Sequence, residues 1–157
     1  MDYDVIAPSY NELHREEQLN KVRIIIKELK ITNEKVLDVG CGTALYSYFF
    51  NDYTGIDNSK KMLEQSNARV IYGKAENLPF HDSSFDAVIC VTAIHNFKEI
   101  NKAITEIRRV SKNKIAITVF KRAKNFLYIK TLINKNFKNI KEIEEEKDII
   151  FIINQTY

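Results

Sequence analysis

Tryptophan is absent from this chain of 157 residues, and cysteine, proline and methionine occur only twice each. Cys41 and Cys90 form no C-x-x-C pair, which argues against a disulfide framework and predicts a reducing compartment, the cytoplasm. No stretch approaches about 18 uncharged apolar residues, so we expect no membrane-spanning helix. The acidic start, with Asp2 and Asp4, is unlike a signal peptide.

Histidine is also scarce, and its spacing is unlike that of a metal site. His14, His81 and His95 form no H-x-H or H-x-x-x-H pair, so we expect no structural metal. Hydrophobic residues make up 45% of the chain and charged residues 29%, which is typical of a folded globular protein. The length predicts a single domain covering residues 1–157.

Charge is distributed unevenly along the chain. Residues 98–141 hold 13 Lys/Arg against 2 Asp/Glu, whereas the whole chain has a net charge of only +3. One interpretation is that these lysines solvate exposed helices. The alternative is a binding surface for a phosphate-bearing partner such as RNA.

The hydrophobic pattern alternates between strand and helix periods. It predicts helices at 10–29, 44–50, 59–66, 99–110 and 124–134, the first of them with a Ser9/Glu12 capping box. It predicts strands at 35–39, 53–57, 69–72, 85–91, 114–120, 138–146 and 148–154. This order indicates an α/β fold with a doubly wound, mostly parallel seven-stranded sheet that ends in an antiparallel hairpin.

All four glycines fall within residues 40–73, which marks that third of the chain as the expected site region. Val36–Ala44 reads VLDVGCGTA, a strand that enters a glycine turn before a helix and so presents backbone N–H groups to a ligand. The dinucleotide fingerprint has a small residue where this chain has Leu45. Asp38, before the turn, would repel a pyrophosphate but suits an ammonium group. Leu45 and Asp38 therefore argue against a nicotinamide dehydrogenase, which is the alternative interpretation of this glycine turn.

Asp57 ends the next predicted strand, in the sequence Gly55-Ile56-Asp57. A carboxylate at this place can accept hydrogen bonds from both ribose hydroxyls of an adenosine. The alternative is a helix cap or a solvated loop residue.

Taken together, these segments resemble the motifs of class I S-adenosylmethionine (SAM)-dependent methyltransferases, most of all the type 11 (UbiE-like) group. The resemblance rests on VLDVGCGTA, GIDNS (55–59), AENLPF (75–80), SFDAVIC (84–90) and the N-terminal Y-D-x-x-A-x-x-Y-N (3–11). It implies a Rossmann-like fold and SAM as the methyl donor, with S-adenosylhomocysteine (SAH) as the product.

The resemblance also implies roles for individual residues. The implied SAM-binding residues are Tyr10, Asp38, Gly40, Cys41, Gly42, Asp57, Asn58, Ala75, Glu76 and Thr92. Asp38 would face the ammonium group, Asp57 the ribose, and Ala75-Glu76 the adenine, while residues 1–30 would cover the SAM site. The family often has Asp where this chain has Lys74, a donor only, so adenine recognition must use other groups.

The segment Thr92–Phe97 follows the fourth strand and is expected to face the methyl-transfer site. His95 is the candidate general base, with a packing role as the alternative. Aromatic residues that could line an acceptor pocket are Tyr10, Phe80, Phe97, Phe120 and Phe126.

The methyl acceptor stays open at this point. With no cap predicted over the site, we lean slightly to a macromolecule such as tRNA, rRNA or a protein, or to a partner subunit that completes the pocket. The alternatives are a small-molecule (UbiE-like) methyltransferase and a non-catalytic SAM-binding subunit. If the substrate is RNA, the expected rim residues are Lys98, Lys102, Lys121, Arg122 and Lys124, with Lys112 and Lys114 at the opposite end of the sheet.

Overall fold

A computed structural model describes residues 3–155 of the chain, and the side chains of residues 15–155. Seven strands form one sheet in the order β3-β2-β1-β4-β5-β7-β6. The strands are β1 (Lys35–Val39), β2 (Asp52–Asp57), β3 (Val70–Tyr72), β4 (Phe85–Val91), β5 (Ser111–Phe120), β6 (Ile140–Glu144) and β7 (Asp148–Asn154). The helices are α1 (Tyr3–Leu29), α2 (Lys60–Glu64), α3 (Ile100–Val110) and α4 (Phe126–Asn136), with 3-10 turns η1 (Ser47–Phe49) and η2 (Ile94–Asn96).

The strand pairing confirms the predicted fold class. β1 to β5 pair in parallel, while β7 runs antiparallel between β5 and β6. β1 lies between β2 and β4, so the strand order reverses direction there. In such sheets a crevice for ligands opens at the carboxyl ends of the strands on either side of this point.

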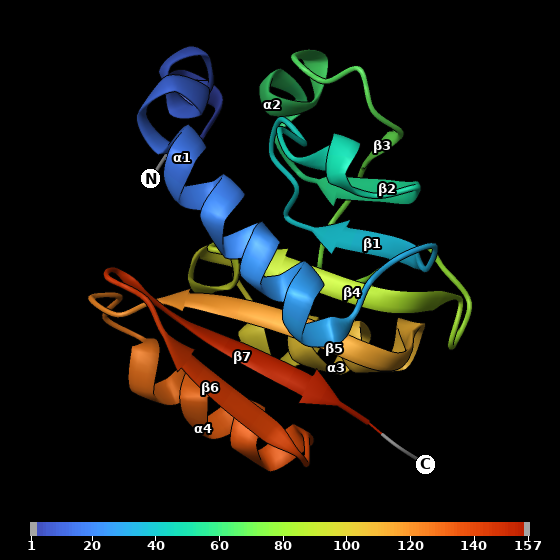
Figure 1. Cartoon of the computed structure of the whole chain (residues 1–157). Coiled ribbons are helices and arrows are strands. Elements are labelled where there is room, and N and C mark those ends of the chain that lie inside the picture. The colour runs from blue at the N-terminus through green and yellow to red at the C-terminus, as the bar shows by residue number, and fades with distance from the viewer. Residues whose placement is uncertain (1–2, 156–157) are drawn as a thin grey trace.

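Helices cover both faces of the sheet, with α1 crossing one face and α3 and α4 packed on the other (Figure 1). Successive side chains of a strand point to opposite faces. Val36 and Ile89 therefore pack in the α1 layer, and their neighbours Leu37 and Val88 pack in the layer of α3 and α4. The strands are buried on both sides, as their near-continuous apolar sequences predict.

The predicted helix boundaries needed two corrections. α1 begins at Tyr3, so the Ser9/Glu12 pair lies inside the helix and does not mark its start. The predicted helix at 44–50 is only the short turn η1, because Ala44 adopts a left-handed conformation with φ of 55° that an α-helix cannot contain. The other predicted elements are present, with ends shifted by a few residues.

Ion pairs attach α1 to the β6–β7 hairpin at three points along the helix. Glu17 pairs with Lys147, Lys21 with Asp148, and Glu28 with Lys141, at 2.7, 2.6 and 2.9 Å. The first and last of these pairs are partly exposed, whereas the middle pair is buried. In the described part of the chain, no helix combines the length and the apolar character needed to cross a membrane.

Candidate cofactor and active site

The turn after β1 contains two glycines in the left-handed region, with φ of 76° at Gly40 and 57° at Gly42. A side chain at position 40 would place its Cβ 2.6 Å from the Cβ of Ala93, in the segment after β4. Real Cβ atoms do not approach this closely, so both the conformation and the space require glycine at position 40.

The carboxylate of Asp57, at the end of β2, is held by two backbone groups. The N–H of Gly42 donates to Oδ2 and the N–H of Ser59 donates to Oδ1, both at 2.8 Å. The hydroxyl of Ser59 accepts from the N–H of Met62 at 3.3 Å and so caps α2. The cap is therefore Ser59, and Asp57 keeps a fixed orientation in which its remaining lone pairs can accept further hydroxyl donors.

The carboxyl ends of β1, β2 and β4 surround a cavity of about 820 Å³. Its walls include the sequence-predicted residues Gly40, Cys41, Gly42, Asp57, Asn58, Ala75, Glu76 and Thr92. Two further predicted residues, Asp38 and His95, are not among the described residues that line it. The side chain of Tyr10 lies outside the described residues.

The cavity also has walls that the sequence did not predict. They include Gln18, Tyr46 and Met62. Tyr46 and Met62 lie two and three positions beyond a recognised motif, so extending each motif by a few positions would have found them. Gln18 had no such signal, because a polar residue on α1 gives no indication that the fold buries it beside the glycine turn.

Asp38 lies within β1, beneath the glycine turn, and is fully buried. The hydroxyl of Tyr53 donates to its Oδ2 at 2.6 Å, whereas its Oδ1 has no hydrogen-bond partner. Burial raises the pKa of Asp38 to about 7, against the lowering effect of Tyr53 and Tyr46. A buried carboxylate oxygen without a donor costs free energy, so a cationic ligand close to Asp38 would favour its ionised form.

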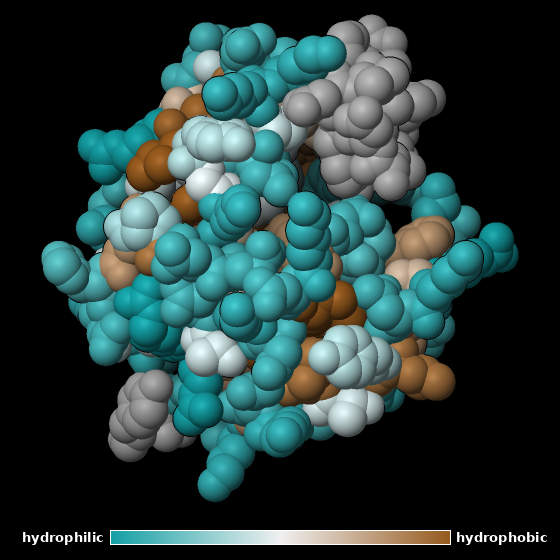
Figure 2. All heavy atoms as spheres, turned by 180° about the vertical axis from the view of Figure 1, so that it is seen from behind, coloured by the Kyte–Doolittle hydropathy of each residue, from teal (hydrophilic) through white to brown (hydrophobic). Residues whose placement is uncertain are grey.

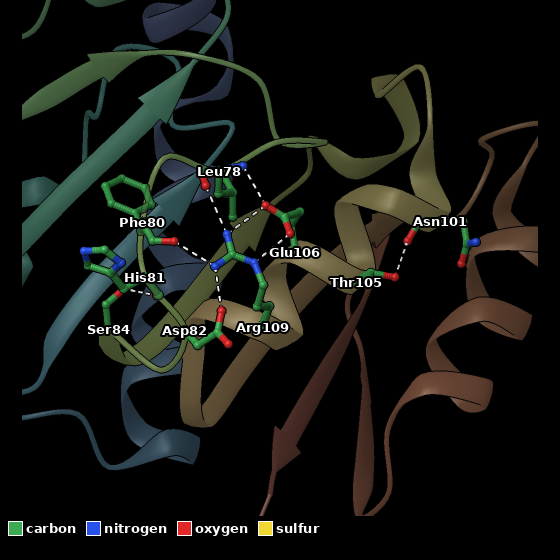
Figure 3. Close-up of polar contacts among 9 residues, drawn as sticks. All are labelled: Leu78, Phe80, His81, Asp82, Ser84, Asn101, Thr105, Glu106 and Arg109. Carbon is green, nitrogen blue, oxygen red and sulfur yellow. Dashed lines mark hydrogen bonds and ion pairs between the residues drawn. The ribbon is translucent and has the colours of Figure 1, made fainter.

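The loop at 73–84, which carries Ala75 and Glu76, is fixed to α3 by side-chain contacts (Figure 3). Arg109 donates from Nη1 to the carbonyl oxygen of Phe80 at 2.8 Å and from Nη2 to that of Leu78 at 3.0 Å. Glu106 accepts from the N–H of Leu78 at 2.8 Å and also pairs with Arg109. The wall expected to contact adenine is therefore held in place by α3, against which Ala75 and Leu78 also pack in one hydrophobic cluster.

Two charged residues of this loop face the cavity. Burial raises the pKa of Glu76, with Glu99 adding to the rise and Lys74 opposing it. Lys74 also lines the cavity. Lys74, which stands where the family often has Asp, would therefore face any ligand that binds in the cavity.

His95 lies in η2, directly after the part of the cavity wall that β4 provides. Its Nδ1 has no hydrogen-bond partner, and its ring centre lies 6.2 Å from that of Phe120. The side-chain amide of Asn125 donates to the His95 carbonyl oxygen at 3.1 Å, which fixes the backbone of η2. Burial lowers the pKa of His95, which favours the neutral form of its imidazole.

Both cysteines are poor nucleophiles in this structure. Cys41 and Cys90 are buried, and burial raises the pKa of each thiol well above its ordinary value. Thiolate chemistry needs a lowered pKa, so neither residue has the environment of a nucleophilic cysteine. Within the described residues, no group of three His, Cys, Asp or Glu side chains could hold a metal ion.

Many lysines of the basic segment 98–141 are paired with carboxylates. These pairs are Lys102–Glu99, Lys112–Asp86, Lys114–Glu34, Lys121–Glu144, Lys130–Glu142 and Lys141–Glu28. Lys98 and Lys102 line the cavity, as expected of rim residues. Six lysines of the segment are therefore paired, five of them with carboxylates from outside the segment.

The aromatic candidates separate into different environments. Phe97 lines the cavity, whereas Phe80 packs edge-on against Phe85 with ring centres 4.9 Å apart. At the start of α4, Leu127 and Tyr128 are 75% and 54% exposed. Figure 2 shows a mostly hydrophilic face with smaller hydrophobic areas between the polar side chains.

Comparisons with known proteins agree with this geometry. Residues 37–117 match the family described as "Methyltransferase domain". An uncharacterized protein of Methanocaldococcus jannaschii is 32% identical over 154 residues, covering 92% of this chain and 61% of that protein. The demethylmenaquinone methyltransferase of Thermotoga maritima is 34% identical over 128 residues, covering 71% of this chain and 56% of the enzyme. The chain thus spans about three fifths of the length of these relatives.

Solved structures share the fold over almost the whole chain. A SAM-dependent methyltransferase from Thermotoga maritima matches with a TM-score of 0.80 at 18% identity, covering 98% of both chains. A Haloferax volcanii chain, solved in complex with the Trm112 methyltransferase activator, matches with a TM-score of 0.79 at 12% identity, covering 98% of this chain and 97% of that one. The family match over residues 37–117, about half of the chain, identifies the chain as a member of the methyltransferase-domain family.

Proposed function

We propose that this chain binds SAM in the 820 Å³ cavity and transfers its methyl group to an acceptor that enters beside η2. The observation that carries the proposal is the 2.8 Å hydrogen bond from the Gly42 N–H to Asp57 Oδ2. This bond joins the glycine turn of β1 to the carboxylate of β2. It holds a narrow backbone passage and a ribose acceptor side by side, which is the arrangement an adenosine with a methionine tail requires.

The residues of the cavity fit SAM in three respects. The unpartnered Oδ1 of Asp38 lies beneath the turn and favours a cationic amino group nearby. Gly40 leaves room where a Cβ would collide with Ala93. Asp57 offers carboxylate oxygens of fixed orientation to two ribose hydroxyls.

The chemistry asks little of the protein beyond alignment. When bound, SAM supplies a methyl group on a positively charged sulfur, which is already reactive. The protein must place the acceptor in line with that group and exclude water. We propose that His95, which follows the cavity wall in η2, takes a proton from the acceptor where one must leave, because burial favours its neutral imidazole.

For the acceptor we propose a small organic molecule with an apolar or aromatic part. Phe97 lines the cavity, and the segment before the exposed Leu127 and Tyr128 is joined to η2 through Asn125. The RNA hypothesis loses support because Lys121, the first of its expected rim residues after β5, pairs with Glu144 at 2.7 Å. The relative that acts on demethylmenaquinone is consistent with a small acceptor.

A second reading is that the chain acts together with a partner subunit. The similarity to a Haloferax volcanii chain solved with the Trm112 activator favours it. In that case the isolated chain would bind SAH but turn over no acceptor until the partner is added.

Calorimetric titration with SAH tests the cofactor site. Asp57→Ala should weaken SAH binding by about tenfold or more, because hydrogen bonds to a charged group contribute about 1.5–3 kcal/mol. The matched control is Asp86→Ala, which removes a carboxylate at the other end of the sheet, where Asp86 accepts from the Lys35 N–H at 2.8 Å. Equal affinity in both variants and the native protein would refute the site, and binding of NAD in place of SAH would restore the dehydrogenase.

The acceptor is tested by SAH release from SAM in the presence of quinols, small amines, bulk tRNA or rRNA. We expect release with a small molecule and none with RNA. Release with RNA that falls steeply with salt would reverse this assignment.

A further inference from the structure

A cluster of five polar residues lies where α1, β4, β5 and β7 meet beside the cavity. It consists of Gln18, Lys21, Thr92, Thr118 and Asp148. Gln18 and Thr92 also line the cavity, so the cluster reaches its wall from two elements. None of its members follows from the motifs except Thr92.

The centre of the cluster is a buried ion pair. The Nζ of Lys21 lies 2.6 Å from Asp148 Oδ2, and the two side chains are only 9% and 1% exposed. Lys21 also donates to Thr92 Oγ1 at 2.9 Å and reaches Gln18 Oε1 at 3.4 Å. A charge pair removed from water in this way needs good geometry to compensate for its lost hydration.

Thr92 is fully hydrogen-bonded within the cluster. Its hydroxyl donates to Asp148 Oδ2 at 2.6 Å and accepts from Lys21. The 3.0 Å contact with Thr118 Oγ1 then takes its second acceptor position. The N–H of Thr92 donates to the same Thr118 oxygen at 2.7 Å.

These contacts hold a backbone conformation that threonine rarely adopts. Thr92 has φ of 50°, in the left-handed region, where a β-branched side chain is strained. The residue directly follows β4 and sets the direction in which the chain leaves the strand. Ala93, the next residue, is the one that closes against Gly40, and His95 follows in η2.

We propose that Lys21 and Asp148 are positioning residues for methyl transfer. Their ion pair fixes the Gln18 wall of the cavity relative to the Thr92 turn, and so places both the cofactor and η2. This inference rests on the proposed function of the cavity, which neither Lys21 nor Asp148 lines. The partly exposed pairs Glu17–Lys147 and Glu28–Lys141 hold the same helix to the same hairpin but do not reach Thr92.

Positioning and stability can be separated because apolar residues often replace a buried ion pair with little loss of stability. The test variant is Lys21→Met with Asp148→Leu, which removes both charges together. We expect a melting temperature close to native and SAH binding weakened by about tenfold, the effect of a misplaced wall. The control, Glu17→Gln with Lys147→Gln, should bind SAH as the native protein does.

A second readout does not depend on the cofactor. The imidazole signals of His95 in NMR spectra of the ligand-free protein should shift in the test variant and stay in place in the control. Native SAH affinity together with unshifted His95 signals in the test variant would overturn the proposal. If the native protein binds no SAH at all, the proposed function fails, and the His95 signals alone decide whether the pair positions η2.

Should the double variant fail to fold, Thr118→Val removes the acceptor of the Thr92 N–H with almost no change of shape. We expect the same direction in both readouts, with a smaller loss of affinity. A native affinity and native His95 signals in this variant would also count against the proposal.

Discussion

The polar groups at the two ends of the parallel strands differ in how completely they are hydrogen-bonded. At the amino end, Lys114 pairs with Glu34 at 2.9 Å and also donates to the Lys30 carbonyl oxygen. At the carboxyl end, Asp38 Oδ1 and His95 Nδ1 have no partner, and they are the only such buried side-chain atoms in the described residues. Unsatisfied buried polar atoms are rare in folded proteins and call for an explanation.

The difference separates stability from function within one sheet. At the amino end, the charged side chains of Glu34 and Lys114 pair with each other, and Lys114 also binds a backbone carbonyl oxygen. At the carboxyl end, one region contains two buried polar atoms without hydrogen-bond partners, a strained Thr92 and two left-handed glycines. Such features persist where a ligand later completes the interactions.

The largest expected effect comes from adding a side chain at Gly40, where the glycine turn lies against Ala93. Gly40→Val should abolish measurable SAH binding, because its Cβ would meet Ala93 at 2.6 Å and its φ of 76° is strained for a β-branched residue. The left-handed conformation alone costs about 1–2 kcal/mol. Titration with SAH together with a melting curve would measure both losses, and native affinity in this variant would contradict the tight passage.

A pH dependence of intermediate size should come from Asp38. Its pKa is raised to about 7 from an ordinary 3.8, so the folded protein holds a proton that the unfolded chain has released. The contribution of this group to stability should therefore fall as pH rises from 3.8 towards 7. Asp38→Asn should flatten this slope in melting curves. A slope that is unchanged in the variant would show that another group is responsible.

The smallest effect belongs to the amino end. Lys114 lowers the pKa of Glu34 to about 2, so the stability from this pair is present above the ordinary value of 4.5 and lost as pH falls towards 2. Glu34→Gln should destabilise the protein by at most about 1 kcal/mol at pH 7, because the pair is partly exposed. Denaturant unfolding would measure this, and SAH affinity should not change. A large loss of affinity would erase the distinction between the two ends.

Most of the fold could be predicted because its signals are local. Apolar runs such as Phe85–Val91 and the glycine turn at Gly40 are readable from short windows of sequence. The helix predicted at 44–50 was wrong because the left-handed Ala44, which the turn geometry imposes, is invisible in the hydrophobic pattern.

The cavity wall was only partly predictable for a related reason. Gly42 and Asp57 belong to motifs, whereas Gln18 and Asp148 act through contacts between elements far apart in the chain. Lys21 looked like any solvated lysine of an amphipathic helix. Its burial depends on where β7 inserts, and no local pattern contains that information.

The insertion of β7 has a consequence for how the chain assembles. β7 lies between β5 and β6, although it follows both in sequence. The hydrogen-bonding edge of β5 is therefore open until Asp148–Asn154 has been synthesised, and only then can Lys21 find its partner. Pairings between distant segments form slowly, and open strand edges invite association with other chains. During synthesis, this protein should therefore pass through a stage in which most of its core is formed, the edge of β5 is unpaired and prone to association, and the ligand cavity is incomplete.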